Sequence, residues 1–212
     1  MLGRSLTHAT LRQGARELAA RDSDLARALD RLGCPPIWGR RPGFSSLVRI
    51  ILEQQVSLRS AAAMYRRLDT HLGGVTPDTF ARTGIRGLRR LGVTRQKAAY
   101  CYGLARRIVD GTLDLSAVAK AADEDGRRTL LDIPGLGPWS VDIYYLMALR
   151  RPDVWPRGDL ALAAALREVK GLSRLPSHEQ QLAFASAWAP WRSVAARILW
   201  AHYLARRGKL ES

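Results

Sequence analysis

Cysteine is scarce in this sequence, and its two positions suggest no metal site. Cys34 stands beside two prolines, and Cys101 lies in an apolar run with helical spacing. Metal sites built from thiols need several closely spaced cysteines, and secreted disulfide frameworks need more pairs in a secretory setting. We therefore expect both cysteines to be buried free thiols.

Long apolar runs are also missing. No stretch approaches the roughly 20 apolar residues that a membrane-spanning helix needs. The N-terminal segment MLGRSLTHATLRQG lacks the apolar core of a signal peptide. We therefore expect a soluble intracellular protein with no membrane partner, cytoplasmic and associated with the nucleoid if the source is bacterial.

Acidic residues and lysines are both few beside arginine. The chain has 19 Asp and Glu against 34 Lys and Arg, only four of them lysines, and its formal net charge is +15. Guanidinium groups form bidentate contacts with phosphate, so the charge favours nucleic acid as a partner. Pairs such as Arg66-Arg67 and Arg89-Arg90 are equally typical of solvated helix faces, so the charge alone decides nothing.

Alternating strand patterns are absent, and apolar residues recur at helical spacing along most of the chain. The pattern predicts an all-α fold with short loops, and 212 residues suit one domain or two small lobes that share a core. We expect pairs of helices within residues 5–32, 77–91 and 113–132, and single helices over 44–52, 57–71, 95–110, 139–149, 160–169, 177–187 and 191–207.

The segment LDIPGLGPWSVDIYYLMALRRPDVWPRGD, from Leu131 to Asp159, differs most from generic helical sequence. Gly135 and Gly137 lie one residue apart in a turn, and Pro138 suits the first turn of the next helix. Backbone N–H groups at such a helix N-terminus form an anion site that fits a phosphate oxygen. An ordinary αα-hairpin explains the glycines equally well. The net charge and the isolated aspartate that ends the segment favour the phosphate site.

These residues resemble the helix-hairpin-helix DNA glycosylase superfamily, and within it the 3-methyladenine DNA glycosylase II type. The family pattern joins an IPGxGxW hairpin, an apolar helix and a P-x-x-D loop, which correspond here to Ile133–Trp139, Ser140–Leu149 and Pro156–Asp159. The similarity also covers Phe44–Ser57, Gly92–Leu115, Pro190–Arg192 and Trp200. It implies the helix-hairpin-helix glycosylase fold, with two helical lobes flanking an active-site cleft and no N-terminal β domain.

The resemblance also implies how the chain is divided. Residues 1–212 would form a single helical glycosylase unit, with residues 1–43 and the C-terminal helices as one lobe and residues 44–131 as the other. Residues 131–159 would be the hairpin and the catalytic loop. We expect a monomer that acts on double-stranded DNA containing a damaged base.

Asp159 is the catalytic residue that the resemblance implies. Breaking an N-glycosidic bond builds positive charge on the sugar, so a carboxylate that stays ionised is needed beside the anomeric carbon. Ahead of the helix that begins at Leu160, Asp159 can accept backbone N–H bonds that favour its charged form. The alternative is a helix N-cap worth about 1 kcal/mol, and both roles can hold together.

Trp139 occupies the position at which bifunctional members of the superfamily carry a lysine that attacks the sugar. No lysine lies between Lys120 and Lys170. We therefore expect a monofunctional enzyme that flips out alkylated purines, such as 3-methyladenine and 7-methylguanine, and hydrolyses their N-glycosidic bond. The indole can stack on an electron-poor, cationic base. Trp200 and Trp38 are the other expected pocket residues, although core packing explains the first equally well and the second better.

Gln54 and Gln55 follow a buried helix at a break in its periodicity. Members of the family push a side chain from this junction into the duplex to fill the space left by the flipped nucleotide. The resemblance assigns this role to Gln55, with Gln54 as the neighbouring candidate. A helix end that simply carries polar residues is the alternative.

The resemblance implies no required cofactor. In relatives, carbonyls at the positions of Leu131, Ile133 and Leu136 bind a sodium, potassium or magnesium ion that also touches a DNA phosphate. Such oxygen ligands suit hard cations, so we expect a weak, DNA-dependent ion. The four C-terminal cysteines of the iron–sulfur members are missing, so we expect no iron–sulfur cluster.

Two other functions stay open. A helix-hairpin-helix protein that binds DNA or recognises damage without catalysis would not need Asp159. A glycosylase for oxidised, deaminated or mismatched bases is disfavoured by Trp139 and by the missing lysine.

Overall fold

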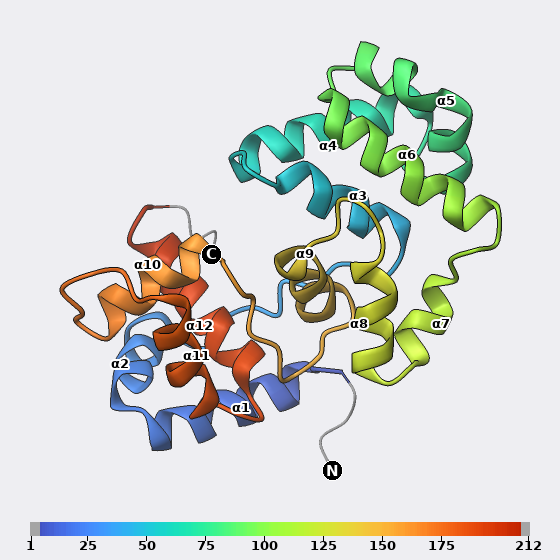
Figure 1. Cartoon of the computed structure of the whole chain (residues 1–212). Helices are drawn as coiled ribbons and strands as arrows, with labels where there is room; N and C mark the ends of the chain where they lie inside the picture. The colour runs from blue at the N-terminus through green and yellow to red at the C-terminus, as the bar shows by residue number, and fades with distance from the viewer. Residues whose placement is uncertain (1–4, 209–212) are drawn as a thin grey trace. The chain divides into compact units, whose positions relative to one another are not determined.

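The computed structural model describes residues 5–208, which contain helices and no β-strand (Figure 1). This confirms the predicted all-α fold, and within these residues no helix is both long and apolar enough to cross a membrane. The elements are α1 His8–Arg21, α2 Ser23–Leu32, α3 Phe44–Glu53, α4 Leu58–Leu72, α5 Pro77–Arg90, α6 Arg95–Val109, α7 Leu115–Lys120, α8 Asp123–Leu131, α9 Pro138–Ile143, the π-helix η1 Tyr144–Ala148, α10 Leu160–Val169, α11 His178–Ser186 and α12 Arg192–Ala205.

Two compact units account for the chain, and we name them by their place in the sequence. The central unit is Arg40–Tyr144. The terminal unit contains the residues up to Gly39 and those from Tyr145 onward. Each unit is described by itself below.

Most helix ends follow capping signals that are visible in the sequence. Thr94 caps α6 by accepting a hydrogen bond from the backbone N–H of Lys97, and Ser57 caps α4 in the same way through Ser60. Gly84 has a φ of 64° and interrupts α5, which confirms the predicted pair of short helices within residues 77–91. These local signals explain why the predicted ends lie close to the observed ones.

The helix predicted over residues 139–149 is present, but only its first half is α-helical. Helix α9 ends at Ile143, and the chain continues as the π-helix η1. In the part of η1 that belongs to the terminal unit, the buried guanidinium of Arg197 donates a hydrogen bond to the Leu146 carbonyl at 3.0 Å. Arg150 then adopts a φ of 54°, and the N–H of Arg151 closes the turn on the Tyr145 carbonyl at 2.9 Å. The sequence carries no local signal for the change from α-helix to π-helix within this run.

The core of the central unit is built around α3, which packs against α4 and α6. Six apolar side chains of α3, among them Leu47 and Ile51, are buried, and Phe44 meets Phe80 of α5 edge to face at 5.2 Å between ring centroids. Cys101 of α6 is buried as predicted, and burial raises the pKa of its thiol to about 12. This packing holds α6 against the end of α3.

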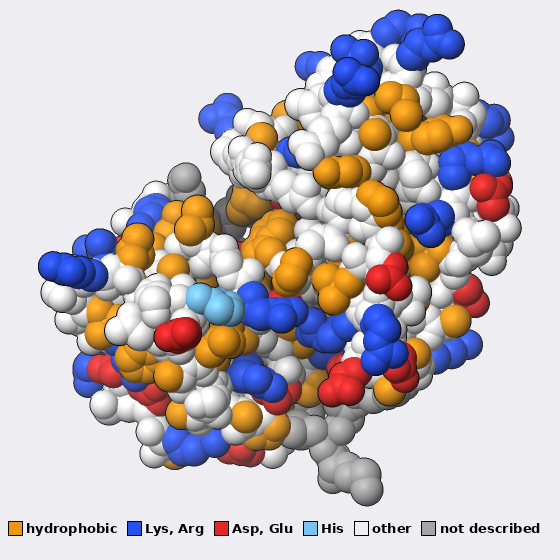
Figure 2. Space-filling view, in the orientation of Figure 1, with side chains coloured by type: hydrophobic (Ala, Val, Ile, Leu, Met, Phe, Trp, Pro, Cys, Tyr) orange, Lys and Arg blue, Asp and Glu red, His pale blue; other side chains and the backbone are white. Residues whose placement is uncertain are grey.

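The surface of the central unit is strongly basic. Figure 2 shows basic side chains gathered over the part of this unit around α4 and α5. The exposed arginines of these two helices are Arg59, Arg66, Arg67, Arg82, Arg86, Arg89 and Arg90. The charge therefore lies outside the core, as it must for either solvated helix faces or a phosphate-binding surface.

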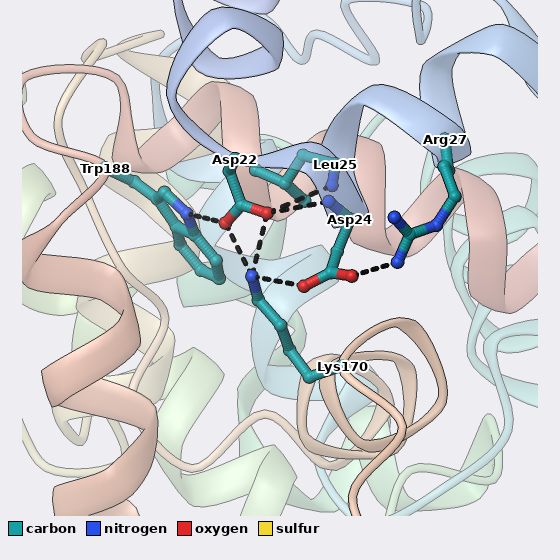
Figure 3. Close-up of polar contacts among 6 residues, drawn as sticks. All are labelled: Asp22, Asp24, Leu25, Arg27, Lys170 and Trp188. Atoms are coloured by element: carbon teal, nitrogen blue, oxygen red, sulfur yellow. Dashed lines mark hydrogen bonds and ion pairs between the residues drawn. The ribbon is translucent and has the colours of Figure 1, made fainter.

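In the terminal unit, α12 packs against α1, α2 and α10. Figure 3 shows the charged cluster of this unit, in which Lys170 Nζ donates to both carboxylate oxygens of Asp22 at 2.7 Å and to Asp24 at 2.9 Å. Trp188 Nε1 donates to Asp22 at 2.8 Å. Burial alone would raise the pKa of Asp22, but the hydrogen bonds from Lys170 and Trp188 outweigh it and the pKa is lowered. The cluster joins α2 to the segments that follow α10 and α11.

Cys34 contradicts the sequence prediction, because its side chain is exposed. It follows Gly33, the residue that ends α2 with a φ of 73°. The turn places the cysteine in an open loop and not in the core.

Candidate functional site

The candidate hairpin joins α8 to α9 in the central unit. Gly135 has a φ of 93°, and a Cβ at this position would overlap the ring of Tyr100. Glycine is therefore required here by both backbone conformation and space. Gly137 is the N-cap of α9, and Pro138 is its first residue, as predicted.

An ion pair that the sequence did not reveal braces this hairpin. Arg127 of α8 bonds to the carboxylate of Asp142 in α9. Asp142 is buried, whereas Arg127 remains partly exposed. The pair links the two helices on either side of the turn, and its residues are far enough apart in sequence that no helical spacing indicates it.

A pocket of about 510 Å³ opens beside the hairpin, entirely within the central unit. Residues 131–137 form one side of it, so the pocket is lined by the three residues whose carbonyls we predicted to bind a cation, Leu131, Ile133 and Leu136. The other side is formed by Gln54, Gln55, Gln96, Lys97 and Tyr100. The structure thus brings the junction after α3 and the predicted hairpin to the same pocket.

Gln54 and Gln55 differ in their surroundings. The side-chain Nε2 of Gln54 donates to the Gly135 carbonyl at 2.8 Å and to Ser140 Oγ at 2.9 Å. Gln55 is exposed and has a φ of 57°, which is unusual for a residue with a side chain. Gln54 is thus engaged in holding the hairpin, and of the two glutamines Gln55 is the exposed one.

Lys97, in the first turn of α6, was not predicted as a site residue from the sequence. Its Nζ donates to the carbonyls of Leu52 at 2.8 Å and Gln54 at 2.7 Å. Burial lowers the pKa of this lysine. The sequence could not reveal this role, because the partners lie 45 and 43 residues away and are main-chain atoms.

Asp159 lies in the terminal unit as the N-cap of α10. Its side chain is 9% exposed, and Oδ1 accepts hydrogen bonds from the Leu162 N–H at 2.9 Å and from Trp200 Nε1 at 3.3 Å. The capping role predicted for this residue is confirmed. Two donors from two helices fix the orientation of the carboxylate at the start of α10, beside the strongly exposed Leu160.

The three tryptophans predicted for the base pocket are distributed over both units. Trp200 is buried in the terminal unit against Asp159. Trp38 is half-buried in the same unit and has a φ of 34°. Trp139 is half-buried in the central unit, one residue after Pro138. Only the pairing of Trp200 with Asp159 is fixed within one unit, and a common pocket for the three stays a prediction.

Comparison with known proteins gives a consistent result. The family described as HhH-GPD superfamily base excision DNA repair protein matches residues 48–191. A putative DNA-3-methyladenine glycosylase of Bacillus subtilis is 32% identical over 165 residues, covering 74% of this chain and 58% of that protein. DNA-3-methyladenine glycosylase 2 of Escherichia coli is 28% identical over 188 residues, covering 82% of this chain and 64% of the relative.

Solved structures share the fold. The crystal structure of a DNA-3-methyladenine glycosidase from Bacillus halodurans superimposes with a TM-score of 0.77 at 27% identity, over 92% of this chain and 91% of the other. The chain spans about half the length of several curated relatives, with 58%, 56% and 43% of their sequences covered. Because the family match covers most of the chain, including the hairpin and Asp159, this chain belongs to the HhH-GPD superfamily of base excision DNA repair proteins.

Proposed function

We propose that this chain is a DNA glycosylase that flips alkylated purines out of duplex DNA and hydrolyses their N-glycosidic bond. The observation that carries the proposal is Asp159, a buried carboxylate oriented by Leu162 and Trp200 at the start of α10. A fixed carboxylate can stabilise the positive charge that develops on the sugar and orient the attacking water. The names of the relatives, which are glycosylases for 3-methyladenine, support this substrate class.

The hairpin would hold the DNA backbone. Gly137 and Pro138 start α9, so the N–H groups of the turn can bind a phosphate, and the basic surface of the central unit can neutralise its neighbours. Gln55 would fill the space left by the flipped nucleotide. Trp139 would stack on the cationic base, which is a good leaving group for the same reason that it stacks well.

The reaction would be monofunctional. Trp139 replaces the lysine that would form a covalent adduct with the sugar, and water is then the nucleophile. Base release should leave the DNA strand intact, with an abasic site as product. Strand cleavage coupled to base release, or an adduct trapped by borohydride, would contradict this part of the proposal.

A hard cation at the hairpin is compatible with the pocket. Leu131, Ile133 and Leu136 line it, and the Ile133 carbonyl accepts one hydrogen bond, from the Leu136 N–H, which leaves its second lone pair for a metal ion. Such an ion would assist phosphate binding and would take no part in the chemical step. Anomalous scattering from thallium at these carbonyls in a crystal with DNA would test it, and its absence at an ordered phosphate contact would reject it.

The decisive experiment is single-turnover base release from duplexes that carry 3-methyladenine, 7-methylguanine, 1,N6-ethenoadenine or hypoxanthine. Asp159→Asn keeps the size and the capping ability of the side chain and removes its charge. We expect release to fall by roughly 100-fold or more while duplex binding and folding remain close to wild type.

Asp114→Asn is the matched control, because Asp114 caps α7 in the same way but is exposed and lies outside the candidate site. This variant should release base at the wild-type rate. A near-normal rate for Asp159→Asn would reduce Asp159 to a helix cap. Specific duplex binding without release by the wild-type protein would favour the non-enzymatic alternative.

A further inference from the structure

Lys97 connects three parts of the central unit that the proposed function uses separately. It lies in the first turn of α6 and its ammonium reaches the end of α3, where it donates to the Leu52 and Gln54 carbonyls at 2.8 and 2.7 Å. Carbonyls in the last turn of a helix lack partners within that helix, and a cation there also complements the helix dipole. Lys97 therefore fixes the main chain at the point where α3 stops.

Gln54 passes this restraint to the hairpin. Its carbonyl is held by Lys97, while its side-chain amide donates to the Gly135 carbonyl and to Ser140 Oγ. The main chain of Gln54 is thus bound by α6, and its side chain by the hairpin and α9. The position of the junction relative to the hairpin is set by these contacts.

Helix α6 also contacts the hairpin directly. Tyr100, one turn after Lys97, places its ring where a Cβ of Gly135 would be, and Gln96 donates to the Tyr100 hydroxyl at 2.8 Å. The same face of α6 therefore touches both the junction and the hairpin. All of these residues except Leu52 and Ser140 line the pocket beside the hairpin.

Gln55 comes directly after the clamped carbonyl. Its φ of 57° is a left-handed conformation that costs a residue with a side chain free energy, and such strain persists only where the surroundings enforce it. Gln55 and the next residue, Val56, are exposed, so packing of their own side chains does not enforce it. The turn is restrained by its two ends, through the contacts of Gln54 before it and the N-cap of Ser57 at the start of α4 after it.

We propose that Lys97 is a positioning residue that holds the Gln54 carbonyl so that Gln55 keeps its left-handed conformation and enters the duplex when the hairpin binds a phosphate. This inference rests on the proposed function. It predicts that Lys97 contributes to base flipping and contributes little to the affinity for undamaged DNA. A lysine that simply contacted phosphate would show the opposite pattern.

The test compares Lys97→Met with Arg95→Met. Both changes remove one positive charge from the first turn of α6, but Arg95 is exposed and lies outside the set of contacts described above. Lys97→Arg serves as the rescue variant, because a guanidinium has several donors with which to reach two carbonyls. If Lys97→Met does not fold, Lys97→Gln, which keeps a donor, replaces it in the same assays.

Three measurements are made on each variant. Fluorescence of 2-aminopurine placed next to an alkylated purine reports flipping, single-turnover assays report base release, and titration with undamaged duplex at several salt concentrations reports phosphate contacts. Hydrogen exchange of the amides of residues 55–57 in the DNA-free protein reports the order of the junction directly.

We expect Lys97→Met to reduce the fluorescence change and the release rate by about tenfold or more, since misplaced groups near a reaction lose at least this much. Its affinity for undamaged duplex should match that of Arg95→Met, exchange at residues 55–57 should be faster, and Lys97→Arg should recover most of each effect. A lesion placed in an unpaired bulge should also recover much of the rate, because less work is then needed to flip the base.

Two outcomes would overturn the inference. Equal behaviour of Lys97→Met and Arg95→Met in flipping and exchange would show that the clamp has no positioning effect. A loss of undamaged-duplex affinity confined to Lys97→Met would make Lys97 a phosphate contact. If the wild-type protein releases no base but flipping and exchange still depend on Lys97, the proposed function fails and the positioning role stands.

Discussion

Apart from the ion pair of Arg127 with Asp142, the polar contacts described around the hairpin differ in kind from the charged cluster of the terminal unit. In the central unit, Gln54 and Lys97 direct their donors at main-chain carbonyls. In the cluster of the terminal unit, charged side chains form ion pairs with one another, Lys170 with Asp22 and Asp24. Contacts to the main chain fix the course of loops, whereas pairs of side chains fix one helix against another.

This difference suggests that the charged cluster serves the stability of the protein and that the contacts around the hairpin serve its activity. The contacts that hold the loops around the hairpin are made mainly to carbonyl groups. They therefore do not occupy the side chains and N–H groups that would contact DNA. The charged cluster of the terminal unit is largely buried, with 13% exposure for the Lys170 side chain and 10% for Asp22. We therefore expect changes in the cluster to lower the free energy of unfolding and changes at the hairpin to weaken DNA binding.

Lys170→Met should give the largest loss of stability. It leaves the carboxylates of Asp22 and Asp24 close together and without their cation, and removal of one partner from a buried pair costs about 3 kcal/mol. Chemical denaturation measures the loss. The control is Arg27→Met, which removes a mostly exposed partner of Asp24 and should cost less than about 1 kcal/mol.

The activity of Lys170→Met distinguishes an effect on stability from an effect on catalysis. Base release per folded molecule should equal that of the wild type, because the cluster is built for helix packing. A release rate that falls while the protein remains folded would show that the division between stability and activity is wrong. If Lys170→Met and Arg27→Met lose the same free energy of unfolding, burial is not what makes the Lys170 ion pairs important.

Helices and their ends could be predicted from the sequence because their signals are local. Thr94, Ser57 and Gly84 each act within a few residues of the boundary that they set. The π-helix was missed because the Leu146 carbonyl is satisfied by Arg197, 51 residues away. Cys34 was misplaced because its hydrophobic character gave no indication of how the turn at the preceding glycine would direct the chain.

The candidate site likewise contains residues that could be predicted from the sequence and one that could not. Gly135, Gly137, Pro138 and Asp159 could be selected from their motifs, and the structure shows the turn and the cap that those motifs predict. Lys97 could not, because its partners are carbonyls whose positions depend on how α6 packs against α3. Motifs identify groups that meet a ligand more readily than the groups that hold them in place.

Gly135→Ala should have the next largest effect. The alanine would have to adopt a φ of 93° and would overlap Tyr100, so we expect a loss of about 1–3 kcal/mol in stability or the same strain expressed as a distorted hairpin. Affinity for undamaged duplex should fall, and its salt dependence should become shallower because fewer phosphates are contacted. Binding titrations at several salt concentrations, together with thermal unfolding, measure both.

Gly137→Ala is the comparison within the same turn. Gly137 has an ordinary negative φ of −84°, and a Cβ there would meet nothing within 4 Å. Loss of the glycine at this N-cap should cost less than about 1 kcal/mol. If the two variants bind duplex equally well, the close approach of Gly135 to Tyr100 is not what shapes the phosphate site.

Trp200→Phe should have the smallest effect. It concerns the candidate catalytic residue Asp159, which is held both by a main-chain contact from Leu162 and by a side-chain contact from Trp200. The change keeps an aromatic ring in the core and removes the N–H that lies 3.3 Å from Asp159 Oδ1. Leu162 still holds this oxygen at 2.9 Å, so the carboxylate should lose part of its orientation and keep its place. A hydrogen bond to a charged group contributes about 1.5–3 kcal/mol, and this one is long, so the loss should lie at the lower end and single-turnover base release should fall about tenfold, less than for Asp159→Asn. Trp191→Phe is the matched control, because that buried indole donates to Glu17 at 2.5 Å in the same unit, outside the candidate site. It should lower the melting temperature and leave the release rate unchanged. If Trp191→Phe slows release as much as Trp200→Phe, the effect of Trp200 comes from packing of the terminal unit and not from its hydrogen bond to Asp159.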